Sequence, residues 1–203
     1  MMDLIIETVK KLETMIKDSG CEDSGIVLDV IPHTVNCQFE RGLCMTASFG
    51  GRSADFITRE PISAKTKISF MYGAPLDSIP IRGAAAAIVN VVAGFFCISR
   101  ILHSCPVSSH PDCQRQLLHE LGGKKIFCNG SIPAIETAFG SAIVTTPQEA
   151  DVILMTGEGI IEPGTGSLLL TYNDTKRILF IGPSTAGIAR MNQLEHWCPF
   201  GTC

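Results

Sequence analysis

RILFIGPST (residues 177–185) is a short apolar run that ends in glycine and small hydroxyl residues. The same pattern occurs twice before it, in KIFCNGS (residues 125–131) and ADVILMTG (residues 150–157). A buried parallel strand reads as a continuous apolar run, and a glycine after the strand allows a tight turn of the backbone. The three runs therefore predict neighbouring parallel strands. Their carboxyl ends would line one crevice, the usual place for a ligand in an open α/β sheet.

The first half of the chain has a different pattern. Apolar residues recur at helical spacing in residues 1–19, and Gly20 ends that pattern, which predicts an amphipathic helix. An alanine-rich buried helix is expected from Gly83 to about Leu102. Between the two helices the sequence predicts a small antiparallel meander and one further extended piece, at residues 26–31, 34–39, 43–49 and 67–72.

A stretch rich in proline, serine, cysteine and histidine, residues 103–112, separates this half from the repeated units. A short helix is expected after it, at residues 114–121. The sequence thus predicts an α/β protein of two lobes with a cleft between them. They are an N-terminal α+β lobe in residues 1–104 and a Rossmann-like parallel-sheet lobe in residues 105–203.

Composition narrows the class of protein. Of 203 residues, 45% are apolar and 18% are charged, which is typical of a globular chain. The net charge of −4, without a basic run, gives no electrostatic reason to bind nucleic acid or an anionic membrane. No secretory pattern is visible, and the most apolar stretch, residues 83–98, is shorter than the ~20 residues of a membrane-spanning helix. We expect a cytoplasmic protein with no nucleic-acid or membrane partner. Its nine cysteines are expected to be free thiols, as in an anaerobe.

Four short motifs resemble those of the heavy-metal chelation family: IRGAAAAIVN (81–90), EADVILMTG (149–157) followed by Gly164–Thr165, GSIP (130–133) and GPST (182–185). The resemblance covers nearly the whole chain. It implies an enolase-N-terminal-like lobe joined to a Rossmann-like lobe. It also implies a role in handling a metal or a tetrapyrrole-like metallo-cofactor in anaerobic metabolism.

The turn at residues 182–185 is the strongest candidate for an anion site. Backbone N–H groups of a glycine turn and of the following helix N-terminus point outward, and Ser184 or Thr185 can cap the helix while touching a ligand. Together with the other strand ends and the resemblance, this predicts a ligand site made of Asn90, Gly130, Ser131, Thr156, Gly157, Glu158, Gly182, Pro183, Ser184 and Thr185.

Alternatives stay open for these residues. The turn at residues 182–185 is equally read as a helix cap without a ligand. The amide of Asn90, in an otherwise apolar helix, lines the cleft or ties two loops together. Glu158 either meets a cation, an amine or a ribose, or is an exposed loop acid.

Cysteine and histidine form two candidate metal-binding groups. His103, Cys105, His110 and Cys113 place four donors within eleven residues. Thiolate and imidazole suit zinc, iron or nickel. A loop shaped by its prolines is the alternative, because this spacing is not the Cys-x2-Cys pair of a zinc ribbon. The role of His196, Cys198 and Cys203 near the C-terminus stays open. Cys37, Cys44, Cys97 and Cys128 lie in apolar runs and are interpreted as small core residues.

Three functional hypotheses remain, and whether the protein is an enzyme stays open. The first is a binding protein or enzyme of metal or metallo-cofactor metabolism that holds a small anionic ligand in the cleft. The second is a Cys/His metal carrier or sensor without catalysis, and the third is a transferase that binds a nucleotide or S-adenosylmethionine. The cofactor is unknown, with a transition metal or a metallo-tetrapyrrole as candidates. A homodimer is plausible if the alanine-rich helix leaves a face uncovered. No Gly-x-Ser-x-Gly elbow and no Gly-x-Gly-x-x-Gly fingerprint occurs.

Overall fold

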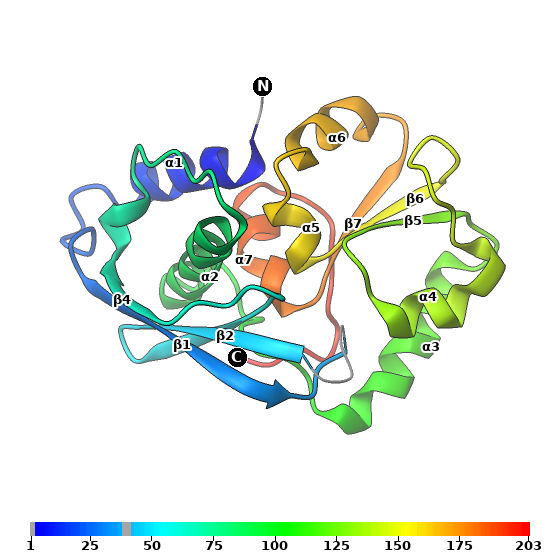
Figure 1. The fold of residues 1–203 in the computed structure, drawn as a ribbon, viewed down its shortest axis with the longest axis horizontal. Helices are drawn as coiled ribbons and strands as arrows, with labels where there is room; N and C mark the ends of the chain where they lie inside the picture. The colour runs from blue at the N-terminus through cyan, green and yellow to red at the C-terminus, as the bar shows by residue number, and fades with distance from the viewer. Residues whose placement is uncertain (1–2, 38–41) are drawn as a thin grey trace.

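The computed structural model describes residues 3–37 and 42–203 and divides them between an antiparallel and a parallel sheet (Figure 1). The N-terminal lobe contains α1 (Leu4–Ile16), β1 (Gly25–Thr34), β2 (Gly42–Phe49), β3 (Arg52–Ile57), β4 (Ala64–Lys67), the 3₁₀ turn η1 (Ile68–Met71) and α2 (Ile79–Phe95). Its four strands pair antiparallel in the order β3-β2-β1-β4.

The C-terminal lobe is built around the three repeated runs. Its elements are η2 (Val107–Ser109), α3 (His110–Leu121), β5 (Ile126–Asn129), α4 (Pro133–Phe139), η3 (Gly140–Ala142), β6 (Val152–Met155), α5 (Gly157–Ile161), α6 (Thr165–Tyr172), β7 (Arg177–Ile181), α7 (Pro183–Met191) and β8 (His196–Trp197). The strands β5, β6, β7 and β8 pair parallel in that order. The predicted α+β lobe followed by a parallel-sheet lobe is confirmed.

The antiparallel sheet differs from the prediction at its hairpins. Gly50 and Gly51 both have positive φ, and Phe49 pairs with Arg52, so these glycines form a two-residue turn between β2 and the unpredicted strand β3. The strand predicted at residues 26–31 continues to Thr34 as one strand, while residues 38–39 of the next predicted strand lie outside the described residues. The extended piece expected at residues 67–72 is mostly the 3₁₀ turn η1.

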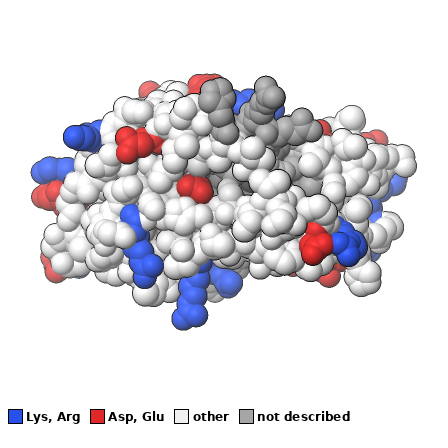
Figure 2. Space-filling view, turned by 90° about the horizontal axis from the view of Figure 1, so that it is seen from below, with Lys and Arg blue, Asp and Glu red and all other residues white. Residues whose placement is uncertain are grey.

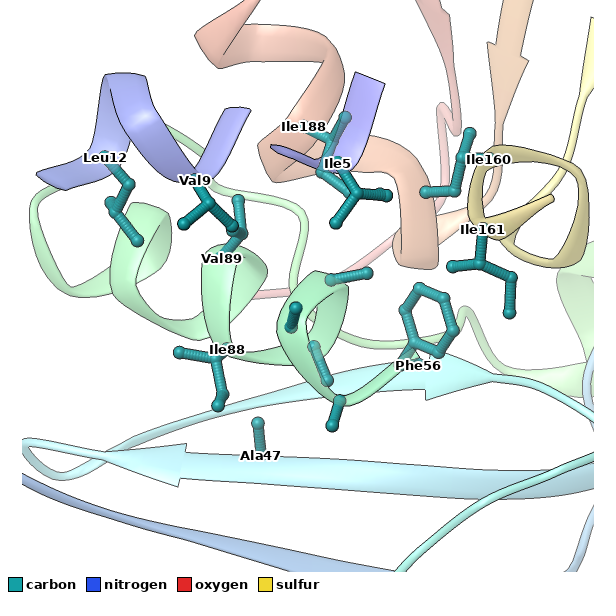
Figure 3. Close-up of a cluster of buried hydrophobic side chains, with 14 of the residues drawn as sticks. Ile5, Val9, Leu12, Ala47, Phe56, Ile88, Val89, Ile160, Ile161 and Ile188 are labelled. Atoms are coloured by element: carbon teal, nitrogen blue, oxygen red, sulfur yellow. The ribbon is translucent and has the colours of Figure 1, made fainter. Parts of the chain in front are cut away.

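The helix α2 lies at the centre of the core. Every residue from Arg82 to Gly94 is buried. Figure 3 shows α2 between the antiparallel sheet on one side and α1 and α7 on the other, with Ala47, Phe56 and Ile188 among the surrounding side chains. The small alanines let the sheet and the helices approach closely, so both lobes share one core. The helix ends at Phe95 rather than near Leu102, and Cys97 just beyond it has a φ of 58°.

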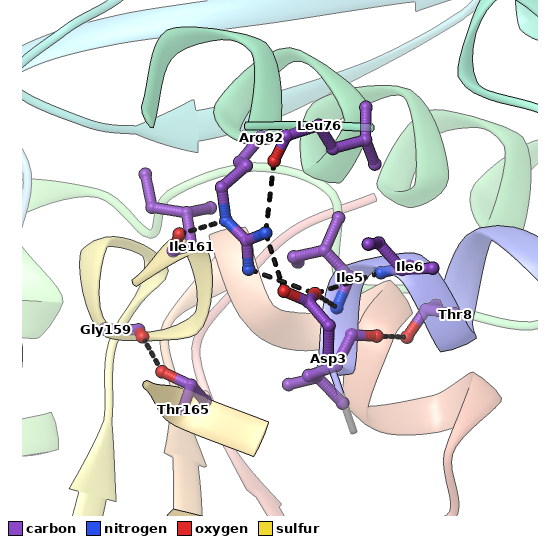
Figure 4. A network of polar contacts seen from close by, with 10 residues as sticks. Asp3, Ile5, Ile6, Thr8, Leu76, Arg82, Gly159, Ile161 and Thr165 are labelled. Carbon is purple, nitrogen blue, oxygen red and sulfur yellow. Dashed lines mark hydrogen bonds and ion pairs between the residues drawn. The ribbon is translucent and has the colours of Figure 1, made fainter. Parts of the chain in front are cut away.

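A buried polar network joins α1, α2 and α5 (Figure 4). The Asp3 carboxylate accepts from the N–H groups of Ile5 and Ile6 and so caps α1. The Arg82 guanidinium pairs with Asp3 and also donates to the carbonyls of Leu76 and Ile161. One buried cation thus ties three helices together.

The end of the chain returns to the N-terminal lobe. His103 and Thr202 exchange two backbone hydrogen bonds of 3.0 and 3.1 Å, and Asp55 of β3 donates its backbone N–H to the Leu102 carbonyl at 2.7 Å. The boundary predicted between residues 104 and 105 stays a prediction.

The surface carries scattered charges. On the face seen in Figure 2, basic and acidic side chains are scattered among uncharged residues. Within the described part of the chain, no helix has both the length and the hydropathy needed to cross a membrane.

Candidate functional site

The carboxyl ends of β5 and β6 come together as predicted, but their polar groups bond to each other. Thr156 Oγ1 accepts from the Gly159 N–H at 3.0 Å and donates to the Asn129 carbonyl at 3.2 Å, so it caps α5. A Cβ on Gly130, whose φ is 85°, would lie 1.9 Å from Thr156 Oγ1. Thr156 thus leaves no room for a side chain at position 130, so glycine is required there. Ser131 next to it is half-buried.

The turn after β7 is covered by the N-terminal lobe. Ser184 Oγ accepts from the Ile57 N–H at 2.8 Å, and Thr185 Oγ1 donates to the Ile181 and Gly182 carbonyls at 3.1 Å. Ser184 and Thr185 are fully buried, and Pro183 is buried beside them. A Cβ on Gly157 would lie 2.6 Å from Ser184 Cβ. Both hydroxyls are thus bonded within the protein, but neither caps α7, whose N-terminus has no side-chain cap hydrogen bond.

Both polar atoms of the Asn90 side chain form hydrogen bonds within the protein. Its Nδ2 donates to the Ser184 carbonyl at 2.7 Å, and its Oδ1 accepts from the Gly187 N–H at 2.9 Å. The amide thus ties two helices, α2 and α7, together, whereas the second alternative stated for it was a tie between two loops. Because both ends of the amide are bonded to backbone, this geometry favours a structural role for Asn90.

Glu158 lies between the lobes rather than on an exposed loop. Its carboxylate accepts from the Arg59 N–H at 3.0 Å and lies 3.5 Å from the Arg59 Nε. Burial raises the pKa of Glu158, and the nearby Arg59 charge opposes that rise. The contact links α5 to the segment after β3.

A cavity lies elsewhere, beside the carboxyl ends of β7 and β8. It has a volume of about 540 Å³ and is bounded by α3, by α4 and by residues 35–37 and 197–200. Apolar side chains such as Val107, Ile132 and Phe200 make up much of its wall. All ten predicted ligand-binding residues are among the described residues. Of these ten, Gly182 alone lines the cavity.

Five soft donors face this opening, which we name the thiol cavity. They are Cys37, Cys105, His110, Cys113 and Cys198. Three of the four predicted metal ligands are thus brought together with Cys198 of the C-terminal group. Cys37, interpreted from the sequence as a core residue, comes to the cavity from beyond β1. No sequence signal reveals this, because its position depends on how the lobes pack.

The other two histidines of the candidate metal-binding groups, His103 and His196, have partners outside the cavity. His103 Nδ1 lies 3.2 Å from Asp55 Oδ1, and its Nε2 lies 3.4 Å from Ser53 Oγ on β3. His103 does not line the thiol cavity. His196 Nε2 lies 2.9 Å from the Gly182 carbonyl oxygen, and Cys203 is exposed.

The thiols influence one another electrostatically. A hydrogen bond with Cys37 lowers the pKa of Cys105 to about 6; burial opposes the shift and the charge of His110 adds to it. The same hydrogen bond raises the pKa of Cys37. Burial raises the pKa of Cys198 to about 12, and the charges of Cys105 and Cys113 contribute further. Negative charge on one sulfur is thus unfavourable for the next.

The donors converge on the cavity without forming an assembled metal centre. In residues 3–37 and 42–203, no three Cys, His, Asp or Glu side chains are arranged to hold a metal ion. The Nε2 atom of His110 is buried and has no hydrogen-bond partner within the described residues. Metal binding at Cys105, His110 and Cys113 stays a prediction.

Comparison with known proteins supports the fold. No family model and no curated protein matches the chain. It is similar to the crystal structure of a protein of unknown function from the DUF364 family of Pyrococcus horikoshii, with a TM-score of 0.50 and 13% identity over 89% of this chain and 79% of that one. At this identity the likeness shows the fold alone.

Proposed function

We propose that this protein is a carrier or sensor of a soft divalent metal ion, which it binds in the thiol cavity. Cys105, Cys113 and Cys198 supply thiolates and His110 supplies a nitrogen. The observation that carries the proposal is the convergence of these donors, from separate parts of the chain, on one opening. Three thiolates and one imidazole suit the tetrahedral coordination of Zn²⁺.

The electrostatics of the cavity support a cation. Thiols bind metal as thiolates and histidine binds as the neutral ring. Without a cation, burial raises the pKa of Cys198, and negative charge on Cys105 and Cys113 raises it further. A divalent ion would lower the pKa values of these thiols, because it stabilises every thiolate around it. The unpartnered Nε2 of His110 would gain a partner at the same time.

Binding would require the donors to move. Since the side chains as they lie hold no metal-binding group of three, their sulfurs must rotate toward a common centre. Staggered rotamers make such movements discrete, and metal binding commonly orders its own ligands. We therefore expect uptake of metal to change the near-UV signal of Trp197, which lines the same cavity.

A metal-containing organic ligand is a second candidate, and the cavity volume favours it. A volume of about 540 Å³ is far larger than one ion needs. It falls within the roughly 300–1,000 Å³ of small-molecule pockets. The apolar wall would contact the organic part while the thiols hold the metal. The anionic ligand predicted at the strand ends stays a prediction.

The test is a Co²⁺ titration of protein purified without oxygen. We expect one ion per chain, with the intense absorption of tetrahedral thiolate-bound Co²⁺ and its replacement by Zn²⁺. Cys113→Ser and Cys198→Ser should each weaken binding by more than about tenfold, because losing a ligand costs more than losing a residue that only orients one. Cys97→Ser is the matched control, because Cys97 is exposed and does not line the cavity. Occupancy below about one-tenth, or equal losses in all three variants, would contradict the proposal.

A further inference from the structure

Asp55 of β3 holds the segment that leads to Cys105. Its backbone N–H donates to the Leu102 carbonyl at 2.7 Å, and its carboxylate Oδ2 accepts from the Ser104 N–H at 3.2 Å. The other carboxylate oxygen, Oδ1, lies 3.2 Å from His103 Nδ1. Only 15% of the Asp55 side chain is exposed, so water competes little for these contacts. One residue of the N-terminal lobe thus contacts three consecutive residues, and Cys105, which lines the thiol cavity, directly follows them.

The same segment holds the end of the chain, which carries Cys198. Leu102 and His103 both donate their backbone N–H groups to the Thr202 carbonyl, at 2.8 and 3.0 Å, and the Thr202 N–H donates to the His103 carbonyl at 3.1 Å. The Gly201 N–H donates to the Cys198 carbonyl at 3.2 Å, which closes a turn. A series of hydrogen bonds therefore runs from β3 to both cysteine-bearing segments, although β3 itself contributes no residue to the cavity wall.

We infer that Asp55 is a positioning residue of the thiol cavity, because it holds in place the two segments that carry Cys105 and Cys198. The effect on metal binding rests on the proposed function, whereas the effect on the two segments does not. Rotation of the two sulfurs, which metal binding requires, then takes place on a fixed backbone. Ligands that are held in place before binding lose less conformational entropy when the metal binds.

The chemistry of the carboxylate suits this role. Oδ1 also accepts from Thr46 Oγ1 at 3.2 Å, and Thr46 lies directly opposite Asp55 on β2. The carboxylate is thus held against the sheet while both of its oxygens face partners, which are Thr46 and His103 for Oδ1 and the Ser104 N–H for Oδ2. An asparagine at position 55 would keep one acceptor oxygen but would turn an NH₂ group toward one of these neighbours. It should therefore have an intermediate effect.

The first experiment measures the Co²⁺ affinity and the Co²⁺ absorption spectrum of Asp55→Ala and Asp55→Asn. We expect Asp55→Ala to weaken binding by about 10–100-fold, as is usual when a residue that orients metal ligands is lost. The thiolate-to-metal absorption should change as well, because the two sulfurs no longer share a fixed geometry. Asp55→Asn should lie between Asp55→Ala and the unmodified protein.

Two control variants separate positioning from general stability. Asp151 also accepts from a backbone N–H, that of Lys125 at 2.8 Å, but it precedes β6 and does not line the cavity. Gly187→Ala should destabilise the packing of α2 and α7, since its Cβ would lie 2.9 Å from Asn90 Cα. Asp151→Ala and Gly187→Ala should both keep the Co²⁺ affinity and spectrum of the unmodified protein.

Hydrogen exchange of the metal-free proteins separates this inference from the proposed function. In Asp55→Ala, peptides that contain residues 102–105 and 198–203 should exchange faster than in the unmodified protein, while peptides from β6 and β7 should not change. Gly201→Ala is a second variant, because its Cβ would lie 2.8 Å from Cys198 Sγ and 2.6 Å from Ile101 Cγ2. It should disturb residues 198–203 and weaken Co²⁺ binding while Asp55 is unchanged.

Each outcome decides part of the inference. Unchanged exchange of both segments in Asp55→Ala, with folding checked by far-UV circular dichroism, would overturn it; if this variant does not fold, Asp55→Asn gives the same test. Faster exchange with unchanged Co²⁺ affinity and spectrum would overturn the effect on metal, as would an equal loss of affinity in either control. If the unmodified protein binds no Co²⁺, the proposed function is wrong, and hydrogen exchange still decides whether Asp55 holds the two segments.

Discussion

The guanidinium of Arg82 holds the carboxylate of Asp3 in two hydrogen bonds, Nη1 to Oδ2 at 2.7 Å and Nη2 to Oδ1 at 3.0 Å. Only 4% of the Arg82 side chain and 20% of the Asp3 side chain are exposed. A buried ion pair of this kind is costly to break from one side, because the remaining charge stays without a partner.

Replacing Arg82 should therefore destabilise the protein strongly. In Arg82→Met, the Asp3 carboxylate and the carbonyls of Leu76 and Ile161 lose a shared donor. We expect the free energy of unfolding, measured with urea, to fall by about 3–5 kcal/mol. Lys10→Met is the control, since Lys10 pairs with Glu7 at the exposed surface, and it should change stability by less than about 0.5 kcal/mol. Similar losses in both variants would contradict the role given to Arg82.

Ser184→Ala tests whether the turn after β7 is structural. The change removes the hydroxyl that accepts from the buried Ile57 N–H. A buried donor left unsatisfied costs about 1–3 kcal/mol, and the loss should appear in urea unfolding without any added ligand. Ser131→Ala, at a half-buried serine of another strand end, should have little effect. Unchanged stability of Ser184→Ala would contradict the structural role given to this hydroxyl.

Gly187→Ala tests how closely α2 and α7 pack. A Cβ at this position would lie 2.6 Å from Asn90 Oδ1 and 2.9 Å from Asn90 Cα. Because the second contact is with backbone, the helices must separate, and we expect a loss of about 1–3 kcal/mol in thermal or urea unfolding. Gly164→Ala has nothing within 4 Å of its added Cβ and should stay within about 0.5 kcal/mol of the unmodified protein. An equal loss of stability in both variants would contradict the role given to the close packing of α2 and α7.

Glu158→Gln tests the pH dependence of stability. Burial raises the pKa of Glu158 in the folded state, with Arg59 opposing, so the native protein holds this proton more tightly than the unfolded chain does. The stability that Glu158 contributes is then fully present at low pH and is lost as pH rises through the folded-state pKa. Glutamine does not ionise. The melting temperature of the variant relative to the unmodified protein should therefore be higher at about pH 7.5 than at about pH 4.5. A difference that stays constant or decreases with pH would contradict this.

The strands of the parallel sheet could be predicted from the sequence because each is a local apolar run. Ile153, Leu154 and Met155 are fully buried in β6, as a strand covered on both faces requires. The strand β3 could not be predicted in the same way, because its six residues are not one continuous apolar run and directly follow Gly50 and Gly51. A turn between two glycines is visible in the sequence only when the pairing of its flanking strands is also considered.

The candidate site could be predicted only in part. Cys105, His110 and Cys113 are close in sequence, and the structure places them at one cavity. His103 belongs to the same motif but pairs with Asp55, a residue from β3 that no local spacing points to. Thr156 and Ser184 have a structural reason to carry a hydroxyl group at the strand ends, because each hydroxyl accepts from a buried backbone N–H.

The sequence by itself determined the two kinds of sheet, their order along the chain and the central alanine-rich helix. These features follow from hydrophobic periodicity and turn chemistry, which act over a few residues. Only the tertiary structure decided that Cys37 and Cys198 line the same cavity as Cys105. It also decided that both polar atoms of the Asn90 side chain bond to α7. Such convergence depends on how distant segments pack against one shared core, and that packing energy is not encoded in any local pattern.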